Sequence, residues 1–263
     1  MPAPDLPPPP THTITQRPLH VHLHPQLTTP DDFAGGVVIV IDALRASVTM
    51  TAAIAHGATC VIPTLSVEDA LAARDALAAA SHTPILLGGE RGGVRIEGFD
   101  LDNSPLAYTP QRVRDRVVVF TTTNGTAALL HARHAASILV GSFANLDAMT
   151  DAVAHDPRPV HILCAGTRDL ISEDDILPAG AMVERLIGMG RQLVADDSGR
   201  LAAHAWRGAL ATPGGVVEAM RQSRGGRNLA NIGLGADVDY CATPNTLGVV
   251  PVFDLASGRI TRR

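Results

Sequence analysis

Residues Val37–Ser47 read VVIVIDALRAS, and this stretch decides how the rest of the chain is interpreted. A run of β-branched apolar residues is followed at once by Asp42 and Arg45, and then by an alanine-rich segment. A short apolar run of this composition predicts a buried strand, and the alanine-rich continuation predicts a helix. The polar residues therefore stand at the junction between a strand and a helix.

The same alternation recurs along the chain. Strands are expected at Val37–Ile41, Thr59–Ile62, Pro84–Leu87, Val117–Thr121, Ile138–Val140 and His161–Cys164. Helices are expected at Ser47–His56, Val67–Ala80, Thr126–Ala136, Leu146–His155 and Pro178–Met189. Continuous apolar strands that alternate with helices indicate a largely parallel sheet covered on both faces. We therefore expect an α/β protein.

The segment Leu19–His24 has a different pattern. His20, His22 and His24 alternate with apolar residues, which predicts a half-exposed strand. Three histidines on one strand face could bind a metal ion, although histidines on a polar strand face are the commoner case.

The two ends of the chain differ from its middle. Residues 1–18 are rich in proline and are expected to form a disordered tail. Beyond Met189 the periodicity weakens, with a helix expected at Val217–Ser223 and a strand at Val249–Phe253. We therefore divide the chain into a main α/β region at 19–190 and a smaller α+β region at 191–263.

The composition excludes several kinds of function. The chain has no lysine, so Schiff-base catalysis, pyridoxal phosphate attachment and a P-loop lysine are excluded. Its net charge of -5 and its 3% aromatic content argue against nucleic acid as a partner. No apolar run is long enough to span a membrane, and no signal peptide is visible. Three separated cysteines do not form a disulfide framework, and a cytoplasmic location is expected.

Polar residues follow four of the predicted strands. They begin at Asp42, Gly88, Thr122 and Ala165. The carboxyl ends of parallel strands lie along one edge of a sheet, and ligands of open α/β sheets bind outside that edge. The sequence GGERGGVRIEGFDLDNSP, at 88–105, is therefore expected to form one wall of a polar cleft, in which glycines let the backbone approach a ligand.

The turn Thr122–Thr126 stands between a predicted strand and a predicted helix. Its hydroxyl groups, Asn124 and its backbone N–H groups at a helix N-terminus favour an anion site, and phosphate is a natural occupant. Simple N-capping of the helix is the alternative, and the turn alone does not distinguish the two.

Several acidic residues are expected at the same edge. They are Asp42, Glu90, Glu173, Asp174 and Asp175. Carboxylates that converge without histidine favour a hard cation, Mg²⁺ above all, whereas capping of helix N-termini is the alternative. Arg45 and Arg91 could clamp an anionic substrate or pair with these acids. Cys164 could be a nucleophile, but a small buried residue at a strand end is the commoner case.

Taken together, these motifs resemble the 2-phosphosulfolactate phosphatase family, also called ComB. The matching segments are VVIVIDALRAS, GGERGGVRIEGFDLDNSP, TTTNGT, LCAGTRDLISEDDILPAGA and YCATPNTLGVVPVFD. They run in the same order from about Val37 to Phe253. The resemblance implies a fold of two α/β lobes with the site between them. It also implies a Mg²⁺-dependent hydrolase that releases phosphate from 2-phosphosulfolactate to give 3-sulfolactate, a step toward coenzyme M in methanogens.

The resemblance carries over Asp42, Arg45, Glu90, Arg91, Asn124, Gly125, Glu173 and Asp174 as matching motif positions. The roles of these and neighbouring residues are inferred from their chemistry. The catalytic and Mg²⁺-binding set is Asp42, Glu90, Glu173 and Asp174. The substrate-binding set is Arg45, Arg91, Thr122, Thr123, Asn124, Gly125, Thr126, Cys164 and Gly166. The chain departs from the family pattern at Asp102, where a glycine is expected, which puts an extra negative charge near the cleft.

The residues favour direct attack by water, with a carboxylate as base, because no standard covalent phosphatase nucleophile is present. A non-catalytic protein that binds small anions in the same cleft is the alternative. A small anionic phosphorylated substrate is the expected partner, and a homo-oligomer is compatible with the sequence.

Overall fold

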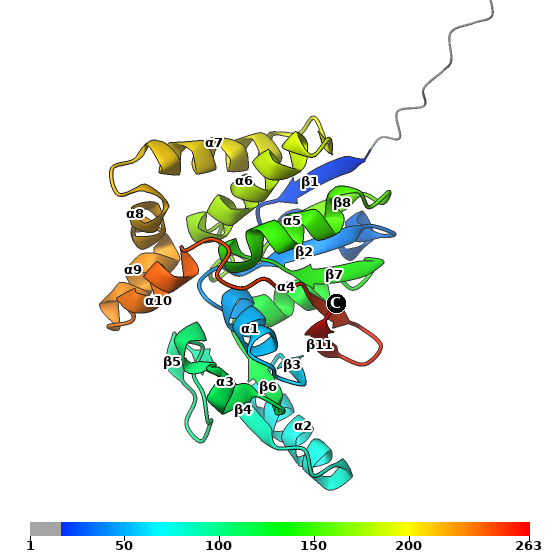
Figure 1. Cartoon of the computed structure of the whole chain (residues 1–263), viewed down its shortest axis with the longest axis vertical. Helices are drawn as coiled ribbons and strands as arrows, with labels where there is room; N and C mark the ends of the chain where they lie inside the picture. The colour runs from blue at the N-terminus through cyan, green and yellow to red at the C-terminus, as the bar shows by residue number, and fades with distance from the viewer. Residues whose placement is uncertain (1–16) are drawn as a thin grey trace, which may run out of the picture.

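Residues 17–263 are described by the computed structural model (Figure 1). The proline-rich segment therefore lies almost wholly outside the described residues. Pro18, which the expected tail includes, is instead the first residue of a strand, and Arg17 donates a hydrogen bond to the carbonyl of Ala154.

One sheet of eleven strands organises the described residues, in the order β5-β4-β6-β3-β11-β10-β7-β2-β8-β1-β9. The strands are β1 (Pro18–His22), β2 (Val37–Ile41), β3 (Cys60–Thr64), β4 (Ile85–Arg91), β5 (Val94–Arg95), β6 (Val117–Thr121), β7 (Ser137–Val140), β8 (Val160–Cys164), β9 (Gln192–Leu193), β10 (Pro251–Asp254) and β11 (Arg259–Arg262). The α/β class and the largely parallel sheet are confirmed.

The sheet consists of two parallel blocks. The first contains β7, β2, β8, β1 and β9, and the second contains β3, β6 and β4. The antiparallel hairpin β10–β11 joins them, pairing with β7 on one side and with β3 on the other. Three successive antiparallel pairings reverse the chain direction, so the two blocks run in opposite senses along the sheet.

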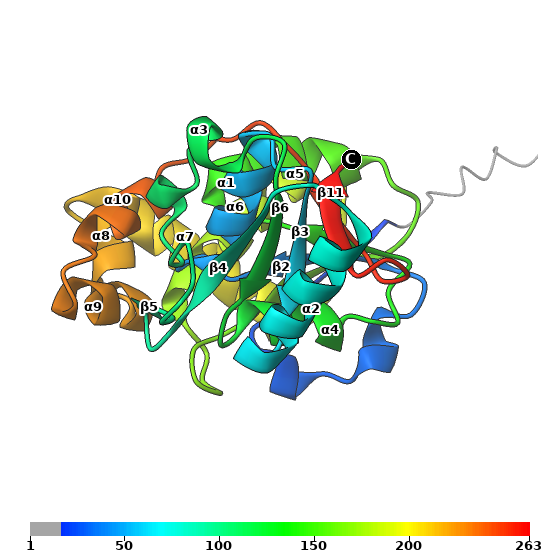
Figure 2. The ribbon, with the colours of Figure 1, turned by 90° about the horizontal axis from the view of Figure 1, so that it is seen from below.

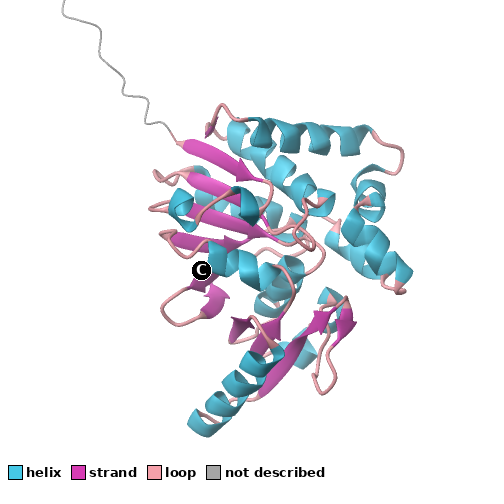
Figure 3. Cartoon of the chain, turned by 180° about the vertical axis from the view of Figure 1, so that it is seen from behind, coloured by secondary structure: helices cyan, strands magenta, loops and turns pink. Residues whose placement is uncertain are grey.

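Sheet twist brings the carboxyl ends of the two blocks together. Adjacent strands rotate relative to each other by roughly 20–25°. Five strand pairings separate β2 from β6, so these rotations add up, and the strands of the two blocks are far from exactly antiparallel. Figure 3 shows the result, in which the strands of both blocks point toward the same region of the molecule. The sequence-based expectation of a single parallel edge was therefore too simple, although the strand ends do meet.

Helices cover both faces of the sheet. They are α1 (Ala46–Ala55), α2 (Val67–Ala80), α3 (Pro110–Val113), α4 (Gly125–His131), α5 (Leu146–Ala154), α6 (Glu173–Gly188), α7 (Asp197–Ala211), α8 (Gly215–Gln222), α9 (Arg224–Asn231) and α10 (Gly235–Cys241). Short 3-10 helices are η1 (Pro25–Leu27), η2 (Pro30–Phe33), η3 (Pro105–Ala107) and η4 (Phe143–Asn145).

Strand β2 shows why both faces are buried. Ile39 and Ile41 belong to a hydrophobic cluster with α6 and α7, whereas Val38 and Val40 belong to a second cluster with α1 and α4. Successive side chains of a strand point to opposite faces, so an unbroken apolar run serves two layers of helices.

The region after residue 190 does not form a separate sheet. Strands β9, β10 and β11 join the same sheet as the main region, and the hairpin β10–β11 links its two blocks. Helices α8, α9 and α10 form a group beside β5, as Figure 2 shows. The part of the chain expected to be a smaller α+β region thus completes the main sheet and covers its carboxyl-end side.

Candidate active site

A cavity of about 530 Å³ lies where the carboxyl ends of the two blocks meet. Its lining comes from four strand ends and from α9. The lining residues are Asp42, Leu44, Arg45, Glu90, Arg91, Gly92, Gly93, Asn103, Thr122, Thr123, Asn124, Thr167, Arg168, Gly225, Asn228, Leu229, Asn231 and Ile232.

The structure brings seven of the candidate site residues to this cavity. They are Asp42, Arg45, Glu90, Arg91, Thr122, Thr123 and Asn124. The remaining candidates are outside the lining: Glu173 is exposed, and Asp174, Gly125, Thr126, Cys164 and Gly166 are buried or lie beneath the surface of the cavity.

Asp42 follows β2 and is 6% exposed. Its Oδ1 accepts a hydrogen bond from the N–H of Ala46 at 3.3 Å, at the start of α1. Burial raises the pKa of Asp42 to about 7, the N–H of Ala46 opposes this, and the negative charges of Asp174 and Glu90 add to it. Asp42 therefore serves in helix capping and also places a carboxyl group that titrates near neutral pH on the cavity wall.

The acidic run at the start of α6 divides between surface and interior. The N-cap is Ser172, so Glu173 is exposed while Asp174 and Asp175 are buried in the first turn. Asp174 accepts a hydrogen bond from the N–H of Gly225, which lines the cavity, so Asp174 lies behind that wall. The expected catalytic position of Glu173 is not supported by this placement.

Asp175 connects two strand ends. Its Oδ1 accepts from the N–H of Ala43 at 2.7 Å, and its Oδ2 accepts from the N–H of Gly166 at 2.8 Å. Burial raises the pKa of Asp175 well above its usual range, and Asp174 and Asp42 add to this. Asp175 therefore fixes the loops after β2 and β8 relative to each other.

Glu90, at the end of β4, uses both carboxylate oxygens within the protein. Oε2 accepts from the N–H of Gly93 at 2.6 Å, and Oε1 accepts from the N–H and hydroxyl of Thr123 at 3.1 and 3.0 Å. Glu90 thus holds the glycine turn after β4 against the turn after β6. These hydrogen bonds position the cavity wall, which Glu90 also lines.

The turn after β6 offers fewer donors than the sequence suggests, because Glu90 already binds the N–H of Thr123. Thr122 is 3% exposed, and its hydroxyl has no hydrogen-bond partner among the described residues. Gly125 does not have a positive φ. A Cβ at Gly125 would instead lie 2.8 Å from the Cβ of Ala46 and 2.9 Å from Oδ2 of Asp42. This glycine is needed for the approach of α4 to Asp42.

The two expected arginines differ in their partners. Arg45 is 2% exposed, pairs with Asp237 on α10, and donates to the carbonyl of Gly93 at 2.9 Å. Arg91 donates to the carbonyls of Glu90 and Leu65 and to the hydroxyl of Thr121. Arg45 therefore has its charge compensated, whereas Arg91 forms no ion pair with a described residue.

Cys164 and Gly166 have structural surroundings. The Cys164 thiol donates to the carbonyl of Asp175, and burial raises its pKa well above the usual range. Gly166 has a φ of +73°, and a Cβ there would lie 2.2 Å from the ring of His24. A buried, neutral thiol outside the cavity lining is not placed to act as a nucleophile.

Several residues that line the cavity were not among the predicted site residues, although Asn103 lies in the segment 88–105 expected to form a cleft wall. They are Asn103, Thr167, Arg168, Asn228 and Asn231. Asn103 is 4% exposed, and its Oδ1 has no partner among the described residues. The three-residue spacing of Asn228 and Asn231 would place them on one helix face, a signal that a helix prediction at α9 could have revealed.

Two other expectations concern histidine and Asp102. His20, His22 and His161 stack with nearly parallel rings, and His24 is buried and caps η1. Within residues 17–263, no group of three or more histidine, cysteine or acidic side chains is arranged to hold a metal ion. The histidine metal site is therefore not formed. Asp102 accepts a hydrogen bond from the N–H of Ser104 and does not line the cavity.

The site therefore combines a buried carboxyl group of raised pKa with arginine and with unpaired polar oxygens. Buried polar atoms normally have hydrogen-bond partners, so unpaired ones on a cavity wall favour a polar ligand. Carboxylate, guanidinium and hydroxyl groups around one cavity can bind an anion and transfer a proton.

Comparisons with known proteins agree with this chemistry. Residues 22–255 match the family model described as 2-phosphosulpholactate phosphatase. A protein from Symbiobacterium thermophilum named probable 2-phosphosulfolactate phosphatase is 40% identical over 85% of this chain and 93% of its own length. Proteins of the same name from Deinococcus radiodurans and Caldanaerobacter subterraneus are 39% and 35% identical, over 85% and 81% of this chain and 90% and 86% of their own lengths.

Among the described residues, none of the helices has both the length and the apolar character needed to cross a membrane.

Proposed function

The chain belongs to the 2-phosphosulpholactate phosphatase family, and on that premise we propose that it hydrolyses a phosphate ester of a small anionic carboxylate. The proposed substrate is 2-phosphosulfolactate or a close analogue, and the products are 3-sulfolactate and phosphate. The three relatives described above align with 81% to 85% of the chain.

The single observation that carries the proposal is the chemistry of the cavity wall. Thr122 Oγ1 and Asn103 Oδ1 are buried and unpaired within the described part of the chain, and both residues line the cavity. A hydroxyl can donate to a phosphoryl oxygen, and an amide can rotate to present its N–H₂ group. These groups favour an oxygen-rich anion over an apolar ligand.

The residues also account for hydrolysis by water. Asp42 is the proposed base, since its carboxyl lines the cavity and has a pKa of about 7. Such a group can accept a proton from an attacking water molecule at neutral pH. Thr122 and Arg91 would stabilise the charge on the phosphoryl oxygens. Glu90 and Asp175 keep the strand ends in register through the backbone bonds described above.

Mg²⁺ is proposed as the cofactor, held by fewer carboxylates than the sequence suggests. Mg²⁺ is commonly bound by one or two carboxylates together with waters and substrate phosphate. Oδ2 of Asp42 accepts no hydrogen bond from a described residue, and Asp174 stands close enough for its charge to raise the pKa of Asp42. The free Oδ2 of Asp42 is the lining oxygen that would hold the ion, whereas Glu90 is already engaged and Asp174 lies behind the wall. When bound, Mg²⁺ would neutralise charge on the phosphoryl group.

The test is phosphate release from synthetic 2-phosphosulfolactate by the purified chain. We expect turnover that excess EDTA abolishes and added Mg²⁺ restores. Turnover that persists in EDTA would refute the metal assignment alone. Calorimetric binding of the substrate without any phosphate release, with and without Mg²⁺, would refute hydrolysis and favour the anion-binding alternative.

A further inference from the structure

A tight turn between β8 and α6 stands at the mouth of the cavity. The N–H of Thr167 donates to the carbonyl of Leu170 at 2.8 Å, and the N–H of Leu170 donates back at 3.2 Å. The two residues between them, Arg168 and Asp169, have φ values of +50° and +60°. Two-residue turns with both central φ values positive strongly favour Asn-Gly or Asp-Gly. Here the chain keeps two charged, non-glycine residues in strained backbone conformations.

Such strain is found where the placement of a side chain matters. Arg168 lines the cavity. Asp169 instead lines a second hollow of about 410 Å³, together with His24 and Arg224. The turn therefore separates the two hollows and directs its arginine to the cavity side.

The partners of the three cavity arginines set Arg168 apart. Arg45 is paired with Asp237, and Arg91 is hydrogen-bonded to two carbonyls and a hydroxyl. Arg168 forms no hydrogen bond or ion pair with any residue in the described range 17–263. Its guanidinium group is thus a cavity-lining cation with all its donors available.

We propose that Arg168 is a specificity-determining residue that binds the sulfonate of the substrate. This inference rests on the proposed function. Asp42, Thr122, Arg45 and Asn103 are all buried polar groups of the lining, so the reacting phosphoryl group, which Asp42 and Thr122 would contact, lies at the floor of the cavity. Arg168 is exposed and belongs to the rim. In 2-phosphosulfolactate the sulfonate is the anion farthest along the carbon chain from the phosphorylated carbon, so it reaches the rim.

A guanidinium group suits this task. Its planar fork donates two hydrogen bonds to an oxyanion, and it stays charged at any physiological pH. The contact would be present in both the ground state and the transition state, because the sulfonate takes no part in the reaction. Loss of such a uniform contact raises KM and leaves kcat unchanged.

The experiment compares Arg168→Gln with the control Arg224→Gln. Arg224 is another exposed arginine near the same turn, but it lines the second hollow and not the cavity. Phosphate release is measured with 2-phosphosulfolactate and with phospholactate, which lacks the sulfonate. For Arg168→Gln we expect KM for 2-phosphosulfolactate to rise about 10- to 100-fold with kcat nearly unchanged. Constants for phospholactate, and both substrates with Arg224→Gln, should stay at wild-type values.

An equal defect on both substrates, a fall in kcat, or no defect would each overturn the assignment to sulfonate. Direct binding of 3-sulfolactate, measured by calorimetry, separates this inference from the proposed function. If the wild-type chain releases no phosphate, the proposed function fails; binding of 3-sulfolactate that Arg168→Gln weakens at least about tenfold still supports Arg168 as the sulfonate contact. Wild-type binding that is absent, or that the variant leaves unchanged, overturns it.

Discussion

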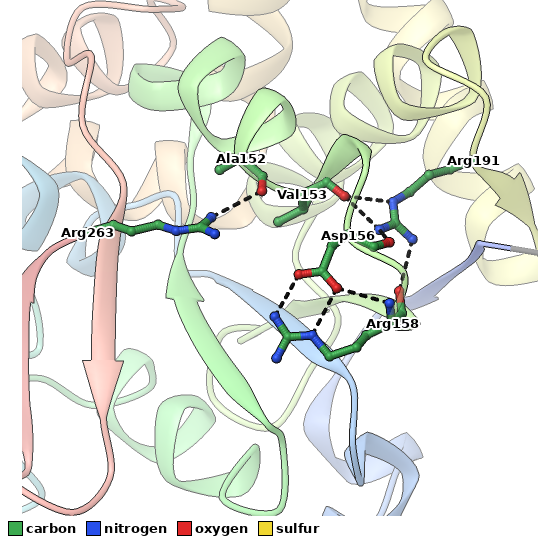
Figure 4. Close-up of polar contacts among 6 residues, drawn as sticks. All are labelled: Ala152, Val153, Asp156, Arg158, Arg191 and Arg263. Carbon is green, nitrogen blue, oxygen red and sulfur yellow. Dashed lines mark hydrogen bonds and ion pairs between the residues drawn. The ribbon is translucent and has the colours of Figure 1, made fainter.

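Arg45 and Arg191 are both buried, and each guanidinium group needs partners for its charge and its hydrogen-bond donors. The two regions supply these partners in different ways. Each is 2% exposed. Arg45 stands on the cavity wall and pairs with Asp237. Arg191 lies at the opposite side of the first block and forms its hydrogen bonds with backbone carbonyls (Figure 4).

The guanidinium nitrogens of Arg191 all donate hydrogen bonds to backbone carbonyls. Its guanidinium donates to the carbonyls of Val153, Pro18, Arg158 and Asp156 at distances of 2.6 to 3.3 Å. Val153 lies in the last turn of α5, whose carbonyls have no partners within the helix. Arg191 therefore caps α5 and joins it to β1 and to the turn before β8.

The region around Arg45 contains buried polar atoms that have no hydrogen-bond partner among the described residues. Within the described part of the chain, Thr122, Thr126 and Asn103 each have a buried polar atom without a partner. The fourth such atom belongs to Glu184, which lies near the guanidinium of Arg207 at the surface. Unpaired buried groups cost stability. Thr122 and Asn103 line the cavity, so this region favours a polar ligand, whereas the hydrogen bonds of the Arg191 region favour stability.

The largest expected effect is that of Asp42→Asn on activity. The change removes the proposed base and the carboxylate proposed to hold Mg²⁺, but keeps an oxygen that can accept from the N–H of Ala46. We expect kcat to fall about 10³-fold, which is within the usual contribution of a general base. The measurement is phosphate release from 2-phosphosulfolactate with saturating Mg²⁺.

The same variant tests whether the ionised Asp42 carboxylate lowers the stability of the folded protein. The folded state binds the Asp42 proton more tightly than the unfolded state, because the pKa is raised from 3.8 to about 7. Stability therefore falls as the pH rises from about 4 to 7, and the asparagine, which cannot ionise, removes that loss. At pH 8 the melting temperature of Asp42→Asn should equal or exceed that of the wild type. A clearly lower melting temperature would contradict the comparison.

Arg191→Ala should have the opposite effects, with lower stability and unchanged activity. Removing the side chain leaves several carbonyls unpaired in the interior, at a cost of about 3 kcal/mol in the free energy of unfolding. The kcat of the folded fraction should stay at the wild-type value, since Arg191 does not line the cavity. Urea unfolding and phosphate release at low temperature measure the two quantities.

Arg158→Ala is the matched control for that prediction. Its side chain is 39% exposed and pairs with Asp156, and exposed ion pairs contribute about 0–1 kcal/mol. Equal destabilisation by Arg158→Ala and Arg191→Ala would show that burial of Arg191 carries no special stabilisation.

Much of the central fold was predictable because its signals are local. The expected strands at Val37–Ile41 and Val117–Thr121 and the expected helix at Val67–Ala80 match the observed bounds. Continuous β-branched runs and alanine-rich stretches have strong intrinsic preferences. The reversal of direction between the two blocks was not predictable, because it depends on where the hairpin β10–β11 inserts into the sheet, which is a long-range pairing.

Helix α8 lies at the expected helix Val217–Ser223, whereas the next helix, α9, escaped prediction for a different reason. Helix α9 has the sequence RGGRNLAN, with two glycines that disfavour an isolated helix. Tertiary contacts support it instead: Ser223 caps it, and the N–H of Gly225 donates to Asp174. Because no helix was predicted there, the cavity residues on α9 were not predicted either.

The acidic run at the start of α6 was located correctly, but the sequence did not predict which of its side chains are buried. The sequence placed Glu173, Asp174 and Asp175 together, but their order of burial depends on the residue at which the helix begins. A shift of one residue rotates a helical side chain by about 100°. The observed start at Glu173 therefore turns Asp174 and Asp175 inward, which no motif could establish.

The smallest expected effect concerns the histidines of β1 and β8, which provide a third region for comparison. Nε2 of His22 lies 3.0 Å from Nδ1 of His161, so one ring must donate and the other accept. Burial lowers the pKa of His22 to about 4 and that of His161 to about 3, and the charge of His20 adds to both shifts. Between pH 3 and 6.5 the unfolded chain thus binds more protons than the folded one at these sites, the reverse of Asp42. Their contribution to stability is complete above pH 6.5 and is lost as the pH falls toward 3.

Comparing the wild type with the double variant His22→Gln/His161→Asn isolates that contribution. Each replacement keeps an amide near the original ring nitrogen but cannot be protonated. As the pH falls from 7 to 6, the wild type should lose about 1–2 kcal/mol of unfolding free energy more than the variant. Urea unfolding at a series of pH values measures the difference, and Asp42→Asn should leave this acid-side difference unchanged. Parallel curves for the wild type and the double variant would show that the neutral histidine pair carries no pH-dependent stability. The loss of stability in acid would then come from groups such as Asp156, whose pKa is lowered to about 2.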